Sequence, residues 1–597
     1  MVTSERGLNL NLLFFTPHAA LWPHTAPEAY LARALSECNH TISYLTCGKA
    51  QTYCAPMTAR QLAPGCATAA SRRVCSDCKA GADAIANVYR FSVDTLARYL
   101  SEEDFTKFQD IAAKAVSAKT LDTEYLGVQV GRIALYEFTL SHKKMSTDLN
   151  EMQWSEYHVY LVNALRTLQG FARYLANTRP DAILTFSPQY SNNNSAMQYA
   201  INHGLRVLFI ESGSNLAHRL DTMRVWDWKV HKLVNPALVY WNKSELNPVT
   251  TYSADQVLGH FEQLLSGHHF AVFSSPYAGS GSLRKRWNIR AEQKILLMTL
   301  SSYDEAYAAL LIGGFPYDKV FSDVFRTQAE WIQATLEWVA ARTDLFLVIR
   351  VHPRDFPNKR ETVRSEQSFM LESLLEHVPG NAHVNWPSEG VSLYELLEDT
   401  DTMLTGWSVT AMEALVLGIP VVTYDANMPS YPSDIQYTGR STAEYFANIN
   451  RALTDGWRLE NAINGFRWLA YNFVTCTVTV SQDFGNFELG RQSRLRRVWL
   501  RIKNWLPILG HSLDLLKWRA ALPGGQVVSM MLEQGYDALP PARKAFKESV
   551  PHLDDRRIVL RCLSRLHKML YANAEFTLDK PGLSRNIRTL LGREDVQ

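Results

Sequence analysis

The sequence predicts an α/β protein with two parallel-sheet domains, and three observations support this. The chain has 597 residues, 46% hydrophobic and 20% charged, which is enough apolar sequence to bury a sizeable core. Strand-like apolar runs alternate with helix-like segments in both halves, as parallel sheets require. A Ser- and Gly-rich stretch near residue 280 separates the halves. We therefore expect domains at 1–273 and 291–480, joined by a linker at 274–290.

The first half begins with a strand–helix–strand pattern. The apolar run LNLLFFT is followed by a loop, by the helix-like EAYLARALSEC and by the alternating strand HTISYLTC. The pattern resumes beyond residue 150, which predicts helices at 156–178 and 195–203 and strands at 181–186 and 206–210. Between these parts, residues 47–150 read as a cysteine-rich and helical insertion.

Cysteines are concentrated just before and within the start of this insertion. Six of the eight lie between residues 38 and 78. Cys75 and Cys78 have the two-residue spacing of a metal knuckle, and they are candidate ligands of zinc or an iron–sulfur cluster. The cluster would include Cys47, Cys54 and Cys66. The alternative is a set of buried free thiols or a role in stapling loops.

The second half repeats the strand–helix alternation. The nearly continuous apolar run LFLVIRV, residues 345–351, is typical of a strand buried on both faces. Other strands are expected at 294–300, 382–385, 402–405 and 420–424, and helices at 325–341, 366–377, 392–399 and 409–417. Two Rossmann-like halves predict a ligand cleft between them, at the carboxyl ends of the strands.

The last part, 481–597, reads as a helical, basic extension. Its segment 491–503 carries six basic residues and no acid, beside an apolar face at helical spacing. This pattern fits an anionic membrane surface, or a helix packed on the core with solvated arginines. With no apolar run of about 18 residues and no signal-peptide pattern, we expect a cytoplasmic protein, at most peripheral on the inner membrane. A net charge of +2 argues against nucleic acid as a partner.

A phosphate site is predicted in the second half by TGWSVTAMEA, residues 405–414. Gly406 permits a tight turn after the strand, and Ser408 and Thr410 stand where the next helix begins. Hydroxyls and unpaired amide groups at a helix start suit a phosphate. Glu413, one turn into the helix, could accept hydrogen bonds from ribose hydroxyls. The alternative is an N-cap with a favourable acid in the first turn.

The segment RVHPRD, which follows the buried strand, adds positive charge to this site. Arg350, His352 and Arg354 would lie in a loop that faces the cleft, because the strand ends there. His352 could also protonate a leaving phosphate. A structural histidine is the alternative.

With these motifs the chain resembles GT-B glycosyltransferases of bacterial capsule and surface-polysaccharide biosynthesis. Capsule-type Kdo transferases and other His-Pro-motif enzymes that use CMP-sugars carry elements similar to IRVHPRD and GWSVTAMEALVLGIPVV. The segments 190–195 and 209–213 are also similar to their Asn-rich and Ile-Glu-x-Gly loops. The resemblance implies that His352, Ser408 and Thr410 hold the donor phosphate and that Glu413 contacts the ribose. It also implies a CMP- or UDP-sugar donor, a saccharide or lipid-linked acceptor, and transfer without a cofactor.

The chain departs from this family pattern in two respects. The cysteine-rich insertion is not part of the general plan, and an acidic motif for the catalytic base is not apparent. Candidates for the base are His18 and His24 in the first loop and Glu211 after the 206–210 strand. All three would lie in first-domain loops at the carboxyl ends of strands.

Three other functions compete with glycosyl transfer to a surface polysaccharide. A polyol-phosphate transferase of the CDP-glycerol type shares the His-Pro loop and the later Ser-rich helix start. A nucleotide-sugar epimerase uses the same two-domain cleft, but would turn over donor without an acceptor. A non-catalytic scaffold is disfavoured by the joint presence of His352, Ser408 and Glu413.

Overall fold

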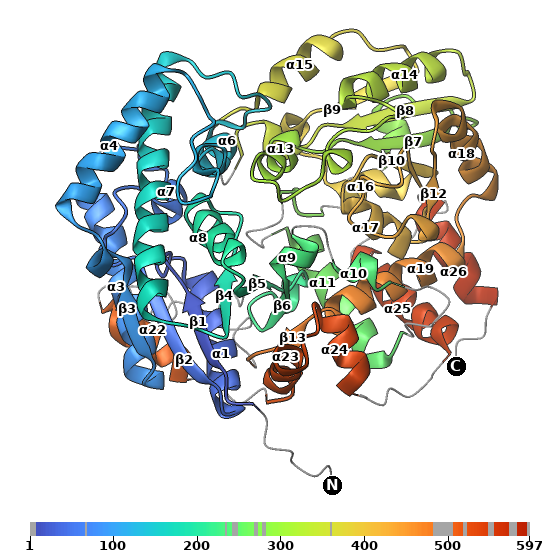
Figure 1. Ribbon diagram of the computed structural model, residues 1–597. Coiled ribbons are helices and arrows are strands. Elements are labelled where there is room, and N and C mark those ends of the chain that lie inside the picture. The colour runs from blue at the N-terminus through green and yellow to red at the C-terminus, as the bar shows by residue number, and fades with distance from the viewer. Residues whose placement is uncertain are drawn as a thin grey trace.

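The computed structural model confirms an α/β fold with two Rossmann-like domains (Figure 1). It describes residues 8–65, 68–232, 236–241, 249–267, 273–277, 282–358, 361–481, 506–516, 522–546, 554–571 and 582–593. The basic segment 491–503 and Cys66 lie outside these residues.

The first sheet has the order β13-β6-β5-β4-β1-β2-β3 within the described chain. Strands β1 to β5 are parallel, and β6 and β13 add antiparallel pairings at one edge. The strand order reverses between β1 and β4, and in such sheets ligands bind beside the carboxyl ends of the strands at this switch point. The strands are β1 Asn11–Phe15, β2 Thr41–Thr46, β3 Ser92–Thr95, β4 Ala182–Phe186, β5 Arg206–Ser212, β6 Thr222–Asp227 and β13 Val478–Thr479.

The predicted insertion contains part of the first sheet. β3 lies inside 47–150, and α3 (Ala69–Tyr89), which carries Cys75 and Cys78, is the crossover helix between β2 and β3. The short and polar sequence SVDT hid this strand from pattern analysis. The helices α4 (Glu102–Ser117) and α6 (Tyr136–His142) then precede the long α7 (Glu151–Asn177).

The second sheet has the order β12-β11-β10-β7-β8-β9 and is parallel throughout the described residues. Every residue of β8 is buried, as its apolar sequence predicts. The switch point lies between β7 and β10. The strands are β7 Lys294–Thr299, β8 Leu345–Arg350, β9 Ala382–Asn385, β10 Thr402–Thr405, β11 Val421–Thr423 and β12 Tyr437–Thr438.

Helices enclose both sheets. Those that matter for the site are α8 (Ser191–Asn202), α11 (Thr251–Ser266), α13 (Tyr303–Leu311), α16 (Leu393–Glu398), α17 (Thr410–Val416) and α19 (Leu459–Ala470). The Asn-rich stretch expected as a loop before residue 195 forms the first turn of α8. There the Asn193 side chain donates to the carbonyl oxygen of Phe186 and fixes the helix to the end of β4.

The described C-terminal helices join both domains instead of forming a separate unit. α19 continues into a π-helical turn, Tyr471–Thr475, and β13 then pairs with β6 of the first sheet. Helices α22 (Pro507–Leu516), α23 (Leu522–Gln534) and α24 (Leu539–Phe546) pack on the first domain, whereas α25 (Asp555–Tyr571) and α26 (Gly582–Arg593) pack on the second (Figure 1). In the described chain, we find no helix with the length and apolar character needed to span a bilayer.

Candidate functional site

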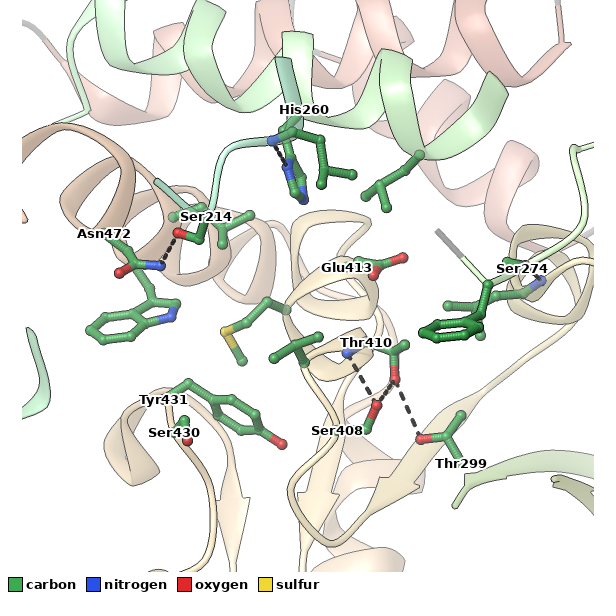
Figure 2. A pocket seen from close by; sticks show the side chains of 18 of the residues that line it. Ser214, His260, Ser274, Thr299, Ser408, Thr410, Glu413, Ser430, Tyr431 and Asn472 are labelled. Carbon is green, nitrogen blue, oxygen red and sulfur yellow. Dashed lines mark hydrogen bonds between the residues drawn. The ribbon is translucent and has the colours of Figure 1, made fainter. Parts of the chain in front are cut away.

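A cavity of about 590 Å³ lies between the two domains. Both domains contribute to its walls, and so do α11, the residues around Ser274 and the end of α19 (Figure 2). The structure therefore brings together most of the predicted site. Six predicted residues line the cavity: Glu211, Arg350, His352, Ser408, Thr410 and Glu413.

Three hydroxyl groups gather at the switch point of the second sheet. The Ser408 and Thr410 hydroxyls are 2.9 Å apart, and Thr410 also donates to the Thr299 hydroxyl at 3.5 Å. Thr299 ends β7 and Ser408 follows β10, so the two central strands place these groups side by side (Figure 2). Helix α17 has only seven residues, which is too short for its N-terminus to form an anion site by itself. The three hydroxyl groups are therefore the main hydrogen-bond donors that this wall offers to an anion.

Glu413 lies above these hydroxyls and is almost fully buried. Burial raises the pKa of its carboxyl group to about 7, although a hydrogen bond from Tyr394 and the nearby Arg350 oppose this rise. Burial likewise lowers the pKa of Arg350 to about 10. The Arg350 guanidinium donates to Asn385 and Val391 and reaches the Ser274 hydroxyl at 3.3 Å. Arg350 thereby joins β8 to the linker.

His352 is held as a neutral ring. Burial lowers its pKa to about 3, and the positive charges of Arg354, Arg350 and Lys143 act in the same direction. Its Nδ1 accepts a hydrogen bond from the Arg354 backbone amide at 3.2 Å. A ring nitrogen that accepts a hydrogen bond carries no proton, so Nε2 bears the proton of the neutral ring. His352 therefore offers an N–H donor rather than the acid that the sequence suggested.

Two predicted donor-site residues do not reach the cavity. Arg354 is buried in an ion pair with Asp304 inside the second domain, and nearby Glu305 and Glu361 also attract its guanidinium. Gly406 lies beneath the ring of Tyr424, and a Cβ atom there would stand 3.2 Å from that ring. Arg354 and Gly406 lie in the turns that follow β8 and β10, and so support the segments that carry His352 and Ser408.

The first-domain wall is formed by β5 and β6. Glu211 and Arg224 are direct partners in the sheet register and form an ion pair at the edge of the cavity. His260 of α11 enters from above, where its Nδ1 accepts the Leu216 amide at 3.0 Å, which again leaves Nε2 as the donor (Figure 2).

His18 lies outside the cavity, contrary to the expected catalytic position. It lies in a small buried pocket at the switch point of the first sheet, together with His24, Glu28 and Asn193. Burial lowers the pKa of both histidines to about 3 and raises that of Glu28 to about 8. Tyr190, which lines this pocket, also packs against a cluster formed by Tyr136 with Ala308 and Ile312 of the second domain.

A loop of the first domain supports the His-Pro segment. Lys143, which follows α6, is 1% exposed at its side chain and donates to the carbonyl oxygens of Arg354 and Val363. It also pairs with Glu361 at 3.0 Å. The neighbouring Lys144 pairs with Glu366. The position of His352 thus depends on residues from both domains.

The cysteines do not form a metal centre in the described part of the chain. Cys47, Cys54, Cys75 and Cys78 are free thiols, and burial raises the pKa of each. Among the described residues, no group of three or more His, Cys, Asp or Glu side chains is placed to hold a metal ion. Cys66 lies outside them, so the metal centre stays a prediction.

Sequence reasoning missed several residues of the cavity. Tyr431, Trp468, Asn472, Arg219 and His260 all line it. They come from two loops, from α19 and its π-helical turn, and from α11. In such segments a single polar or aromatic residue does not indicate a binding site by sequence alone. Only the π-helical turn, a feature frequent at functional sites, marks Asn472 in the structure.

No family model and no curated protein matches the chain. Solved structures similar to it include a UDP-GlcNAc 2-epimerase from Methanocaldococcus jannaschii, at 12% identity over 77% of this chain and 98% of that one, with a TM-score of 0.26. A β-Kdo 2,4 transferase from Thermosulfurimonas dismutans has 17% identity over 48% and 87%, with a TM-score of 0.26. The Neisseria meningitidis UDP-GlcNAc 2-epimerase has 12% identity over 78% and 94%, with a TM-score of 0.24. At such scores, the fold assignment depends on the two sheet orders.

Proposed function

We propose that this protein is a glycosyltransferase that transfers a sugar from a nucleotide-sugar to a surface polysaccharide. The observation that carries the proposal is the arrangement of Ser408, Thr410, His352 and Glu413 around one interdomain cavity. Hydroxyl and neutral imidazole donors suit a phosphate, and a neighbouring carboxyl group suits ribose hydroxyls. The motif resemblance favours CMP- or UDP-sugars and a capsule-type acceptor, at the cytoplasmic face of the membrane.

In the proposed reaction, an acceptor hydroxyl attacks the anomeric carbon of the donor. The bond from that carbon to the phosphate oxygen breaks, and the nucleotide leaves with the bonding electron pair. Ser408, Thr410 and the Nε2–H of His352 stabilise the charge that develops on the phosphate. The hydroxyl proton must pass to a base, and Glu211 is our candidate because it lines the cavity from the first domain. His18 does not line this cavity.

The first test is a thermal-shift screen with CMP, CDP, UDP, GDP and their sugar or glycerol conjugates. A ligand that binds only the folded protein raises its melting temperature in a saturable manner. We expect one nucleotide class to stabilise the protein, and His352→Ala to weaken that binding at least tenfold. His203→Ala, which changes an exposed histidine outside the cavity, is the matched control.

The outcomes of this screen separate the candidate functions. Stabilisation by CDP-glycerol alone would favour a polyol-phosphate transferase, and donor turnover without acceptor would favour an epimerase. If none of the nucleotides shifts the melting temperature, the donor site is refuted and a non-catalytic scaffold becomes the better explanation.

A further inference from the structure

Tyr431 presents a buried hydroxyl group to the cavity. The residue follows β11 and is 2% exposed, and its hydroxyl interacts with the side chain of Thr405 but makes no hydrogen bond of ordinary geometry to a described residue. Burial raises its pKa, and the nearby Thr405 only moderates this rise, so the phenol remains protonated. Figure 2 shows the hydroxyl directed toward Ser408. Buried polar groups are normally paired, so this position requires an explanation.

The residues on either side of the Ser408 and Thr410 hydroxyls indicate which part of a ligand would contact Tyr431. Ser408, Thr410 and Glu413 occupy the middle of the view, with Ser274 on one side and Ser430, Tyr431 and Asn472 on the other (Figure 2). In the proposed complex, phosphate and ribose occupy the middle. A nucleotide-sugar extends from its phosphate in two directions, with the nucleoside on one side and the glycosyl group on the other.

The side of Tyr431 has the chemistry of a sugar site. Asn472 donates to the Ser214 hydroxyl at 3.0 Å, while its Oδ1 is buried without a partner in the described chain. Trp468 lies one helical turn before Asn472 and also lines the cavity. Neutral amide and hydroxyl groups can match sugar hydroxyls, and an aromatic ring can cover the apolar face of a sugar ring.

We propose that the Tyr431 hydroxyl is a specificity-determining group that hydrogen-bonds the glycosyl part of the donor. This inference rests on the proposed function, since it assumes that a nucleotide-sugar occupies the cavity. Without a sugar, the buried hydroxyl has only its weak interaction with Thr405, which compensates poorly for the loss of bulk water. With the sugar bound, the missing hydrogen bond is formed.

The test compares Tyr431→Phe with Tyr44→Phe. Tyr44 is also a buried tyrosine whose hydroxyl lacks a partner, but it belongs to the first-domain core, away from the cavity. Each protein is titrated with UDP and UDP-GlcNAc, and with CMP and CMP-N-acetylneuraminate, and its melting temperature is measured without ligand. The nucleotide alone reports on the donor site, and the additional affinity of the conjugate reports on the sugar site.

We expect Tyr431→Phe to keep the melting temperature or raise it, to bind the bare nucleotide as the wild type does, and to bind the conjugate about tenfold more weakly. Tyr44→Phe should retain both affinities. The inference alone is overturned if Tyr431→Phe binds the conjugate normally, or if the wild type gains no affinity from the sugar. If no nucleotide binds the wild type, the proposed function fails and this inference fails with it.

Discussion

At the scale of single residues, burial sets the charge of the groups around the cavity. His352 is neutral because burial and three nearby cations lower its pKa, whereas burial brings the pKa of Glu413 close to neutrality. The raised pKa of Glu413 reduces the negative charge of the site, which favours binding of an anionic ligand. A bound phosphate would favour protonation of His352, so its capacity as an acid depends on the ligand.

Replacing Glu413 with Gln should change how stability depends on pH. The pKa of this carboxyl group is about 7 in the folded chain, above its value in an unfolded one. Glu413 therefore makes stability fall as pH rises from about 4.5 to 7, by at most about 1 kcal/mol per pH unit. In Glu413→Gln this contribution is absent, so the variant should gain stability relative to the wild type as pH rises.

The measurement is the melting temperature at half-unit steps from pH 4.5 to 8. Glu151→Gln, which changes a surface carboxylate, is the control and should follow the wild type throughout. A constant difference between Glu413→Gln and the wild type across this range would contradict the assigned shift.

At the scale of elements, the sequence correctly predicted those site residues whose position is set by a strand and the turn after it, and failed for residues whose position is set by distant contacts. The continuous apolar run of β8 and the Gly-Trp-Ser turn after β10 correctly placed His352 and Ser408 at one edge of the sheet. The same reasoning was wrong in placing Arg354 at the cavity, because its partner Asp304 is fifty residues away and unrelated by pattern. His18 is likewise buried among first-domain residues far apart in the chain, including Glu28 and Tyr190, which local periodicity does not reveal.

The loop after α6 is expected to control the donor site through Lys143. In Lys143→Met, the carbonyl oxygens of Arg354 and Val363 lose their donor, and His352 loses one of the charges that lower its pKa. We expect several-fold weaker nucleotide binding and a higher His352 pKa, measured by calorimetry and by NMR titration of the imidazole. Lys119→Met, at an exposed ion pair, is the control.

Nucleotide binding that is unchanged in Lys143→Met, together with an unchanged His352 pKa, would show that the loop does not position the His-Pro segment. A lower affinity with an unchanged pKa would also contradict the electrostatic part of the argument.

At the scale of the whole molecule, the described C-terminal helices complete the first domain. Val528 and Met531 of α23 belong to the same buried cluster as Leu12 of β1 and Tyr30 of α1 (Trp22–Glu37). The sequence predicted that this region is helical but did not indicate where the helices pack, because the apolar face of a helix does not specify which surface it contacts. These helices reach the first domain because the chain passes through the π-helical turn and returns to the first sheet as β13.

The variant Met531→Ala should therefore weaken the first domain although it lies far along the chain. A fully buried methionine replaced by alanine costs about 2–5 kcal/mol. Limited proteolysis should reveal earlier cleavage within residues 8–232, while the second domain keeps its resistance. Met152→Ala, at an exposed position, is the control. Equal protection of the first domain in Met531→Ala and the wild type would contradict this packing.

The return of the chain to the first sheet also has a consequence for biosynthesis. When the ribosome has made residues 1–273, the growing protein still lacks β13 and the helices that cover α1. More than two hundred further residues must be synthesised before β13 and these helices can cover the apolar surface of the first domain. Translation order therefore leaves the nascent first half with exposed apolar surface that chaperones can bind, and the second domain is completed last, when α25 and α26 have been made.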